Sequence, residues 1–240
     1  FYTATIMPYR LCFVEESSLE WQIVEYSIDG LFGIDILVNF FSAYTDENGL
    51  LVVNNKKIAR NYLKTWFLLD LIATLPFQPM FELLTGGGGE DSQYSGLLGL
   101  ARLPRLYRLM KIFKLIKMIR IFKYSAWAQK WARQLKINSG ISRMIKFTIS
   151  MMLLVHIMSC LWYFSARYED FNPDTWVWRY GIIDEDNWTK YITSLYWAFS
   201  TLTTVGFGDI TAYTNQERLL SILWITFGVG FYSFTIGNLS

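Results

Sequence analysis

The sequence predicts an all-α membrane protein, and three observations favour this fold class. Of the 240 residues, 52% are hydrophobic and 18% are aromatic, more than a soluble domain normally holds. Several apolar stretches approach the roughly 20 residues that a helix needs to cross a bilayer. One of these stretches, residues 102–123, carries a basic residue at every third position. The net charge is only +2, so no overall field indicates a nucleic-acid partner.

Five longer stretches and one short stretch are predicted to lie in the membrane. The longer ones are residues 22–44, 62–84, 102–123, 143–168 and 218–240. The first thirteen residues look like the end of a further span, broken at Pro8. Residues 191–203 number only about a dozen, which suits a re-entrant helix better than a full crossing. The chain begins and ends in apolar sequence, so we expect it to be a segment of a longer protein.

The charges of the loops predict the orientation of the chain in the membrane. Basic residues gather in the loops 45–64 and 124–140, at Lys56, Lys57, Arg60, Lys64, Lys130, Arg133 and Lys136. Acidic residues gather in the stretch 169–186 that follows the predicted span 143–168. Because basic loops stay on the cytoplasmic side, the acidic stretch is expected to face outside.

The basic stretch 102–123 is the most informative part of the sequence. Its eight cationic residues are Arg102, Arg105, Arg108, Lys111, Lys114, Lys117, Arg120 and Lys123. One charge at the centre of a bilayer costs roughly 2.5–3.5 kcal/mol, so eight need partners. A spacing of three winds them slowly around an α-helix, where an acidic group could meet them one after another as the helix slides. Moving one charge through the membrane field is worth about 2.3 kcal/mol per 100 mV, so the stretch is predicted to sense voltage.

Two other interpretations of the basic stretch are weaker. An amphipathic helix lying on an anionic membrane surface would gather its charges on one broad face, whereas these spiral. A nucleic-acid-binding helix does not fit the apolar spans on either side.

Acidic and aromatic residues suited to this sensor occur in two neighbouring spans. Asp29 and Asp35 lie in the stretch 22–44, and Asp70 lies in the stretch 62–84. Carboxylates inside a membrane are costly and therefore usually paired. Phe32 precedes Asp35 by one helical turn. Its ring could separate the two sides of the membrane field, so that one basic residue passes it at a time. The alternative is that these acids sit at the water interface.

Residues 203–209 read TTVGFGD, which matches the potassium-filter pattern TVGYG except at one position. The backbone carbonyls of Thr204, Val205, Gly206, Phe207 and Gly208 are the predicted filter, and K⁺ is the expected permeant ion. Glycine permits the backbone angles that such a filter needs. Tyr196 and Trp197 are predicted to form an aromatic cuff behind it. With Phe207 in place of tyrosine, we expect selectivity to survive and the rigidity of the filter to fall.

Two single residues carry further predictions. His156 is the only histidine and has no neighbours that would complete a metal site, so it is expected to be packed, neutral and hydrogen-bonded. Asn187-Trp188-Thr189 is an acceptor sequence for N-glycosylation in the predicted outer loop, which makes Asn187 a candidate site. The alternative is an unused sequence too close to the membrane.

With these features placed, the chain resembles the voltage-gated potassium channels of the ether-à-go-go, cyclic-nucleotide-gated and hyperpolarisation-activated superfamily. The resemblance rests on SIDGLFGIDILVNFFSAY, WFLLDLIATLPF, HIMSCLWY and YSFTIGN, and the filter TTVGFGD is close to the ether-à-go-go form. It implies a six-helix channel fold with most of the first helix missing. The voltage sensor would be residues 1–123, the linker 124–142, and the pore domain, with its re-entrant pore helix, 143–240.

The resemblance also implies a function and partners. It implies a voltage-gated potassium channel in a multi-pass arrangement, in a plasma or ciliary membrane, surrounded by lipid. Four copies, or four repeats of a longer chain, would surround one pore. A cyclic-nucleotide-binding-like domain would follow Ser240, and no cofactor is expected within the segment itself.

Two alternatives remain open at this point. One is a non-selective cation channel of the same superfamily. The other is a sensor-bearing membrane protein that regulates something else, as in voltage-sensing phosphatases, against which the filter argues. No catalytic constellation is visible, so an enzyme is not expected.

Overall fold

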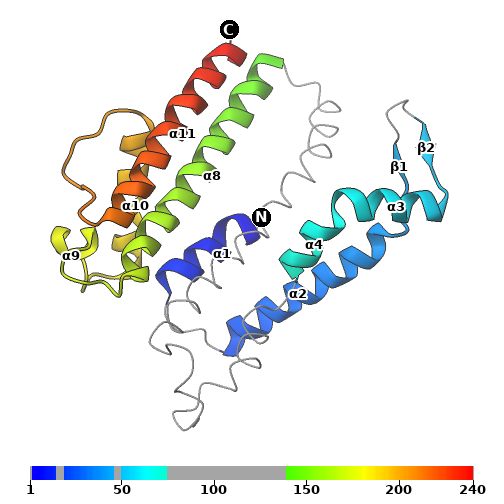
Figure 1. Ribbon diagram of the computed structural model, residues 1–240, viewed down its shortest axis with the longest axis horizontal. Coiled ribbons are helices and arrows are strands. Elements are labelled where there is room, and N and C mark those ends of the chain that lie inside the picture. Colours follow the sequence, from blue (N-terminus) through cyan, green and yellow to red (C-terminus); the bar gives the residue numbers. More distant parts are fainter. Residues whose placement is uncertain (1, 15–18, 46–49, 75–138, 240) are drawn as a thin grey trace. The chain divides into compact units, whose positions relative to one another are not determined.

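The computed structural model describes residues 2–14, 19–45, 50–74 and 139–239, which are mostly helical as predicted. They fall into two compact parts. One part holds α2, β1, β2, α3 and α4, and the other holds α1, α8, α9, α10 and α11 (Figure 1). The basic stretch 102–123, with all eight predicted gating charges, lies outside the described residues, as does most of the linker.

The first part begins with α2, Leu19–Asn39, which covers most of the predicted span 22–44. The helix ends five residues earlier than predicted, and local hydrogen bonds explain why. The N–H groups of Phe40 and Phe41 donate to carbonyls three residues back, at 3.2 and 3.0 Å, which tightens the last turn. The side chain of Asn39 also donates to the carbonyl of Asp35 at 2.6 Å, so it competes with the helical backbone pattern.

A short hairpin and two helices follow within the same part. The strands β1, Tyr44–Thr45, and β2, Leu51–Val52, pair antiparallel, with Tyr44 opposite Val52. Helix α3, Asn55–Thr65, starts where the side chain of Asn54 accepts the N–H of Lys56 at 3.0 Å. Helix α4, Phe67–Thr74, covers the described start of the predicted span 62–84. The hairpin and α3 were expected to be loop. The basic residues of this stretch lower its mean hydropathy, so the apolar face of α3 was not evident from the sequence.

That face consists of Ile58 and Tyr62, which are four residues apart and both buried. The rings of Phe40 and Phe67 cover this face. Tyr62, Phe40 and Phe67 lie edge to face with one another, with centroids 5.1 to 5.9 Å apart. Such aromatic contacts stabilise beyond the area they bury. They hold the end of α2 against α3 and α4.

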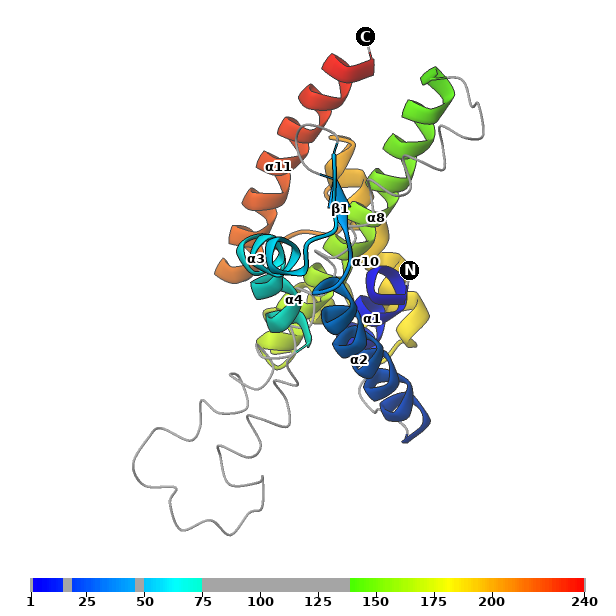
Figure 2. The same cartoon turned by 90° about the vertical axis from the view of Figure 1, so that its right-hand side faces the viewer.

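The second part is built around α8, Ser139–Tyr168, a helix of 30 residues that extends the predicted span 143–168 at its start. Helices α1, Tyr2–Phe13, α10, Asn187–Leu202, and α11, Asn215–Leu239, all pack against it (Figure 2). Among the described residues, Gly140–Tyr168 is the one helix whose length and mean hydropathy suit a membrane crossing. The short helix α9, Trp176–Tyr180, lies in the loop that was predicted to face outside.

The predicted break at Pro8 is wrong, because helix α1 runs through that residue without interruption. Proline removes one backbone hydrogen bond and crowds the preceding turn, which destabilises an isolated helix. Here Pro8 is fully buried, and its neighbours Met7 and Ala4 are buried as well. Packing on α8 and α10 therefore compensates for the lost hydrogen bond.

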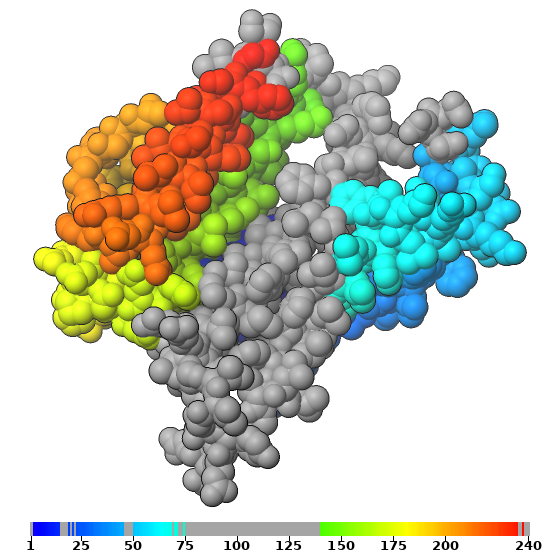
Figure 3. Space-filling view, viewed as in Figure 1, coloured from blue at the N-terminus to red at the C-terminus, as the bar shows by residue number. Residues whose placement is uncertain are grey.

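Stacked tryptophans form the core of the second part. Trp162 of α8 stacks on Trp197 of α10 at 3.6 Å and on Trp176 of α9 at 5.5 Å. The indole N–H of Trp176 donates to the carbonyl of Trp162 at 3.1 Å. Trp224 of α11 donates in the same way to the carbonyl of Ala198 at 3.1 Å. Figure 3 shows α11 and α8 side by side on one face of this part.

Candidate functional site

The predicted filter follows directly from α10, and the start of that helix is fixed by a capping side chain. Asp186 accepts hydrogen bonds from the backbone N–H groups of Trp188, at 3.2 Å, and Thr189, at 3.4 Å, and from the Thr189 hydroxyl. These bonds, the hydroxyl of Thr189 first among them, lower the pKa of Asp186. Asn187, the glycosylation candidate, is exposed as the first residue of the helix.

The end of α10 holds the first residues of the filter. The N–H of Thr203 donates to the carbonyl of Phe199 at 2.9 Å and closes the last turn. The N–H groups of Val205 and Gly206 then both donate to the carbonyl of Ser200, at 3.0 and 3.1 Å. Because the last carbonyls of a helix carry a partial negative charge, α10 presents a weak attraction for cations where the filter begins.

The backbone of the filter alternates in handedness. Thr204, Gly206 and Gly208 have positive φ angles of 59°, 52° and 78°, whereas Val205 and Phe207 do not. In a β-strand, successive carbonyls point in opposite directions. A left-handed residue at every second position changes this alternation, so successive carbonyls can point to the same side. Thr204 is β-branched, and a left-handed conformation costs such a residue about 1–3 kcal/mol. The sequence gives no sign that threonine takes this conformation.

The two residues of the predicted cuff have different surroundings. The ring of Tyr196 lies parallel to that of Phe207, with centroids 6.0 Å apart. Trp197 points instead toward α8, where it stacks on Trp162 and is buried. Within the described chain, the ring that faces the filter is therefore that of Tyr196.

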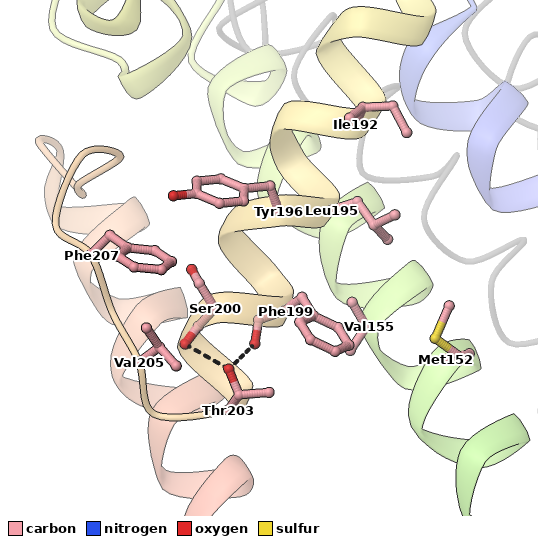
Figure 4. Close-up of a pocket in the computed structure, with 10 residues that line it drawn as sticks. All are labelled: Met152, Val155, Ile192, Leu195, Tyr196, Phe199, Ser200, Thr203, Val205 and Phe207. Carbon is pink, nitrogen blue, oxygen red and sulfur yellow. Dashed lines mark hydrogen bonds between the residues drawn. The ribbon is translucent and has the colours of Figure 1, made fainter.

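An apolar cavity of about 390 Å³ lies between α8, α10 and the filter (Figure 4). Figure 4 shows the side chains of Val205 and Phe207 pointing from the filter toward α10, while Met152 and Val155 line the cavity from α8. Phe207 is 68% exposed despite its apolar ring. The predicted filter thus presents the apolar side chains of Val205 and Phe207 to the cavity beside α10.

The predicted sensor residues lie in the other part of the structure. Asp29, Phe32 and Asp35 lie on α2, each partly buried. Asp70 on α4 is fully buried, and its Oδ2 accepts a hydrogen bond from the hydroxyl of Tyr62 at 2.8 Å. A buried carboxylate requires such compensation. Tyr62, and Phe40 that packs on it, were not singled out from the sequence, because hydropathy does not show which rings of separate segments meet.

Glu217 is a further residue that sequence reasoning missed. It is fully buried at the start of α11, and its carboxylate accepts the backbone N–H groups of Trp176, at 2.9 Å, Tyr213, at 2.9 Å, and Thr214, at 3.2 Å. The hydroxyl of Thr214 accepts the N–H of Glu217 in return, at 3.2 Å. This reciprocal pattern is a capping box, and the spacing Thr214-x-x-Glu217 could have revealed it. The bond to Trp176 fastens α9 to the start of α11.

His156 is hydrogen-bonded, as the sequence predicts. Its Nε2 lies 2.9 Å from the carbonyl oxygen of Thr5, and its Nδ1 lies 2.9 Å from the hydroxyl of Tyr191. The imidazole ring of His156 on α8 therefore joins α1 to α10. Within the described residues, no group of three or more histidine, cysteine, aspartate and glutamate side chains could hold a metal ion.

The chain can be compared with known proteins. The family model described as "Ion transport protein" matches residues 1–240. The chain is 38% identical over 247 residues to potassium channel KAT1 of Oryza sativa subsp. japonica, covering 100% of this chain and 31% of that protein. It is 35% identical to potassium channel KAT2 of Arabidopsis thaliana and 31% identical to potassium channel AKT1 of the same plant, covering 32% and 26% of their lengths. The chain thus spans about a third or less of these curated relatives.

Proposed function

The chain belongs to the ion transport protein family, and on that premise we propose that it is the membrane region of a voltage-gated, potassium-selective channel. The observation that carries the proposal is the filter TTVGFGD, held at the end of a short helix with left-handed backbone at alternate residues. Membership in this family also means an integral multi-pass membrane protein that moves ions and not an enzyme. The relatives named above are all called potassium channels.

Potassium selectivity follows from how the filter replaces water. An ion entering the filter gives up its hydration shell, and backbone carbonyls substitute for it. Thr204, Val205, Gly206 and Phe207 supply those carbonyls in our proposal. The bonds from Val205 and Gly206 to Ser200 hold the backbone against the end of α10, which supports a conformation of this chain's carbonyls that is fixed before the ion enters.

Voltage sensing follows from the basic stretch and its acidic partners. The gating charges from Arg102 to Lys123 would move past Asp29, Asp35 and Asp70, with Phe32 as the ring that divides inside from outside. Asp70 supports this role because it is fully buried yet carries a carboxylate that a cation could meet. The hydrogen bond from Tyr62 fixes the direction of that carboxylate.

The pore requires more than one copy of the pore domain. A single set of carbonyls cannot surround an ion, and potassium filters consist of four such loops. Helix α11 exposes large apolar side chains on several sides, among them Ile222, Leu223 and Phe234, which suits contact with lipid and with neighbouring copies. We therefore propose a homotetramer, or four repeats of a longer chain, in a plasma or ciliary membrane. A cyclic-nucleotide-binding-like domain beyond residue 240 would regulate it.

The alternative is a non-selective cation channel with the same architecture, and one measurement separates the two. The full-length protein is expressed in oocytes, and tail-current reversal potentials are recorded while external K⁺ is replaced by Na⁺. A potassium-selective pore shifts its reversal potential with external K⁺ and carries little Na⁺ current. A reversal potential that stays near zero when the two ions are exchanged would establish the non-selective channel instead.

A further inference from the structure

The two cysteines of the chain lie together in the interior of the second part. Cys12 is on α1 and Cys160 is on α8, and both are free and 0% exposed. The two side chains are close enough to interact with each other. The residues are far apart in the sequence, so only the packing of α1 on α8 brings them together.

Contacts on both sides of the pair fix this packing. The Nε2 of His156 lies 2.9 Å from the Thr5 carbonyl oxygen, and the ring of Tyr163 stacks on Phe13 at 4.3 Å. Farther along, Nη1 of Arg167 donates to the carbonyl of Cys12 at 2.8 Å. His156, Tyr163 and Arg167 lie four residues before, three after and seven after Cys160, which places all of them on one face of α8.

These contacts advance in the same direction along both helices. Low residue numbers of α1 meet low numbers of α8, and high numbers meet high numbers. Figures 1 and 2 show α1 beside the same stretch of α8. The contacts of neighbouring residues therefore hold the segment around Cys12 beside the segment around Cys160.

We propose that Cys12 and Cys160 form an oxidisable dithiol, which a small two-electron oxidant of the peroxide class converts to a disulfide that ties α1 to α8. One thiol attacks an oxygen of the peroxide, the O–O bond breaks, and a sulfenic acid and one water form. The second thiol attacks the sulfenic sulfur, the S–O bond breaks, and a second water leaves as the S–S bond forms. The two sulfurs together lose two electrons, and the peroxide gains them.

The burial of both residues determines which reagents can act. A peroxide is about the size of water and uncharged, so it can reach a site that admits no bulky reagent. Alkylating reagents larger than the free space around the thiols should leave both cysteines untouched while the protein is folded. This contrast between a small oxidant and a larger alkylating reagent is particular to a buried pair.

The bond would have a consequence for gating that rests on the proposed function. Helix α1 lies in the predicted voltage sensor, and α8 is the first helix of the predicted pore domain. A disulfide between them closes a loop from residue 12 to residue 160 that contains α2, α3, α4 and the basic stretch 102–123. It would prevent any separation of α1 from α8 during opening and would restrict the ensemble of the unfolded chain.

Mass spectrometry tests the disulfide directly. The full-length protein in membranes is treated with hydrogen peroxide, unfolded in the presence of an alkylating reagent, and digested with trypsin. Cleavage after Arg10, Lys56, Lys146 and Arg167 places Cys12 in the peptide of residues 11–56 and Cys160 in the peptide of residues 147–167. We expect the two peptides to be joined, with the loss of two hydrogens, and to separate after reduction.

Two variants provide the controls, Cys12→Ser and Cys160→Ser, and neither should yield the joined peptide. Recovery of both wild-type peptides as separate alkylated or further oxidised species after peroxide treatment would overturn the proposal. A parallel recording compares the conductance–voltage curve before peroxide, after peroxide and after dithiothreitol. We expect a reversible shift in the wild type that both variants lose. A joined peptide without any shift would contradict the effect on gating, whereas a joined peptide in a protein without voltage-gated current would contradict the proposed function alone.

Discussion

The imidazole of His156 accepts a hydrogen bond from the hydroxyl of Tyr191, and the partners on both sides of the ring determine this direction. Nε2 lies 2.9 Å from the carbonyl oxygen of Thr5, which can only accept, so Nε2 carries the proton. Nδ1 of the neutral ring is then an acceptor, and the Tyr191 hydroxyl, 2.9 Å away, donates to it. One side chain of α8 thereby connects α1 to α10, the helix that precedes the predicted filter.

Replacing Tyr191 by phenylalanine should weaken this connection without disturbing the packing around it. The ring of Tyr191 lies edge-on to Tyr9 and Phe13, and phenylalanine keeps those contacts. Loss of the hydroxyl leaves Nδ1 without its donor, which should lower stability by roughly 0.5–1.5 kcal/mol. Thermal unfolding of the purified channel in detergent measures the change. Tyr180→Phe, which removes a hydroxyl from an exposed ring, is the control, and an equal loss of stability in both variants would contradict the assigned bond.

Replacing Gly206 by alanine should abolish potassium-selective current. The structure leaves room for a Cβ at this residue, because no atom lies within 4 Å of the position it would take. The penalty therefore comes from the φ angle of 52°, which an L side chain rarely adopts. Gly30→Ala in α2 is the matched control, since it also has free space but helical backbone, and it should retain the current. Selective current in the Gly206 variant, recorded by patch clamp, would remove the filter assignment.

Glu217→Gln should destabilise the outer end of the pore domain. An amide presents one acceptor oxygen and one NH₂ donor, whereas Glu217 faces backbone N–H groups with both of its oxygens. One of these N–H groups would lose its acceptor and meet another donor, which should cost about 1–3 kcal/mol. A lower melting temperature of the purified channel is the expected result. Glu185, between α9 and α10, is exposed, so Glu185→Gln should leave the melting temperature unchanged.

Acid should weaken the cap of the pore helix through Asp186. The hydrogen bond from the Thr189 hydroxyl, together with those from the backbone N–H groups of Thr189 and Trp188, lowers the pKa of this carboxyl. Because the folded pKa lies below the unfolded one, the contribution of Asp186 to stability is complete above the ordinary aspartate pKa and is lost as the pH falls through the lowered value. Asp186→Asn caps the helix without titrating. The difference in melting temperature between wild type and this variant should therefore shrink or reverse in acid, and a difference independent of pH would refute the prediction.

Asp70→Asn should shift the conductance–voltage curve more than Tyr62→Phe does. The first change removes a buried charge that we propose meets the gating charges, while the second removes only the hydrogen bond of 2.8 Å that orients it. Two-electrode voltage clamp measures the midpoint and the slope. Tyr26→Phe, an exposed residue of α2, serves as the control and should shift neither. If Asp70→Asn behaves like the control, Asp70 is not a partner of the gating charges.

Local sequence patterns were sufficient for much of the fold. Hydropathy located α8 and α11 to within a few residues, because a helix that crosses a membrane must be apolar over about 20 residues wherever it packs. The short apolar run 191–203 predicted a short helix, and the structure has α10, Asn187–Leu202, at this place, while its re-entrant position in the membrane stays a prediction. The motif TTVGFGD was recognisable because its glycines have a local conformational role, and Gly206 and Gly208 do take positive φ angles, while its role as a filter stays a prediction. The spacing of Thr214 and Glu217 could have predicted their capping box in the same way, but it was overlooked.

The sequence by itself thus determined the long apolar helices α2, α8 and α11, the motif TTVGFGD and the positions of charge along the chain, since each depends on residues a few positions apart. Only the tertiary structure decided which residues meet across long separations. Thr5 meets His156 at a separation of 151 residues, and Glu217 meets Trp176 at a separation of 41. The uninterrupted path of α1 through Pro8 and the pairing of Cys12 with Cys160 have the same origin. In each case the contact joins segments that are distant in the sequence, and a local pattern shows which face of a segment is apolar but not which segment will cover it.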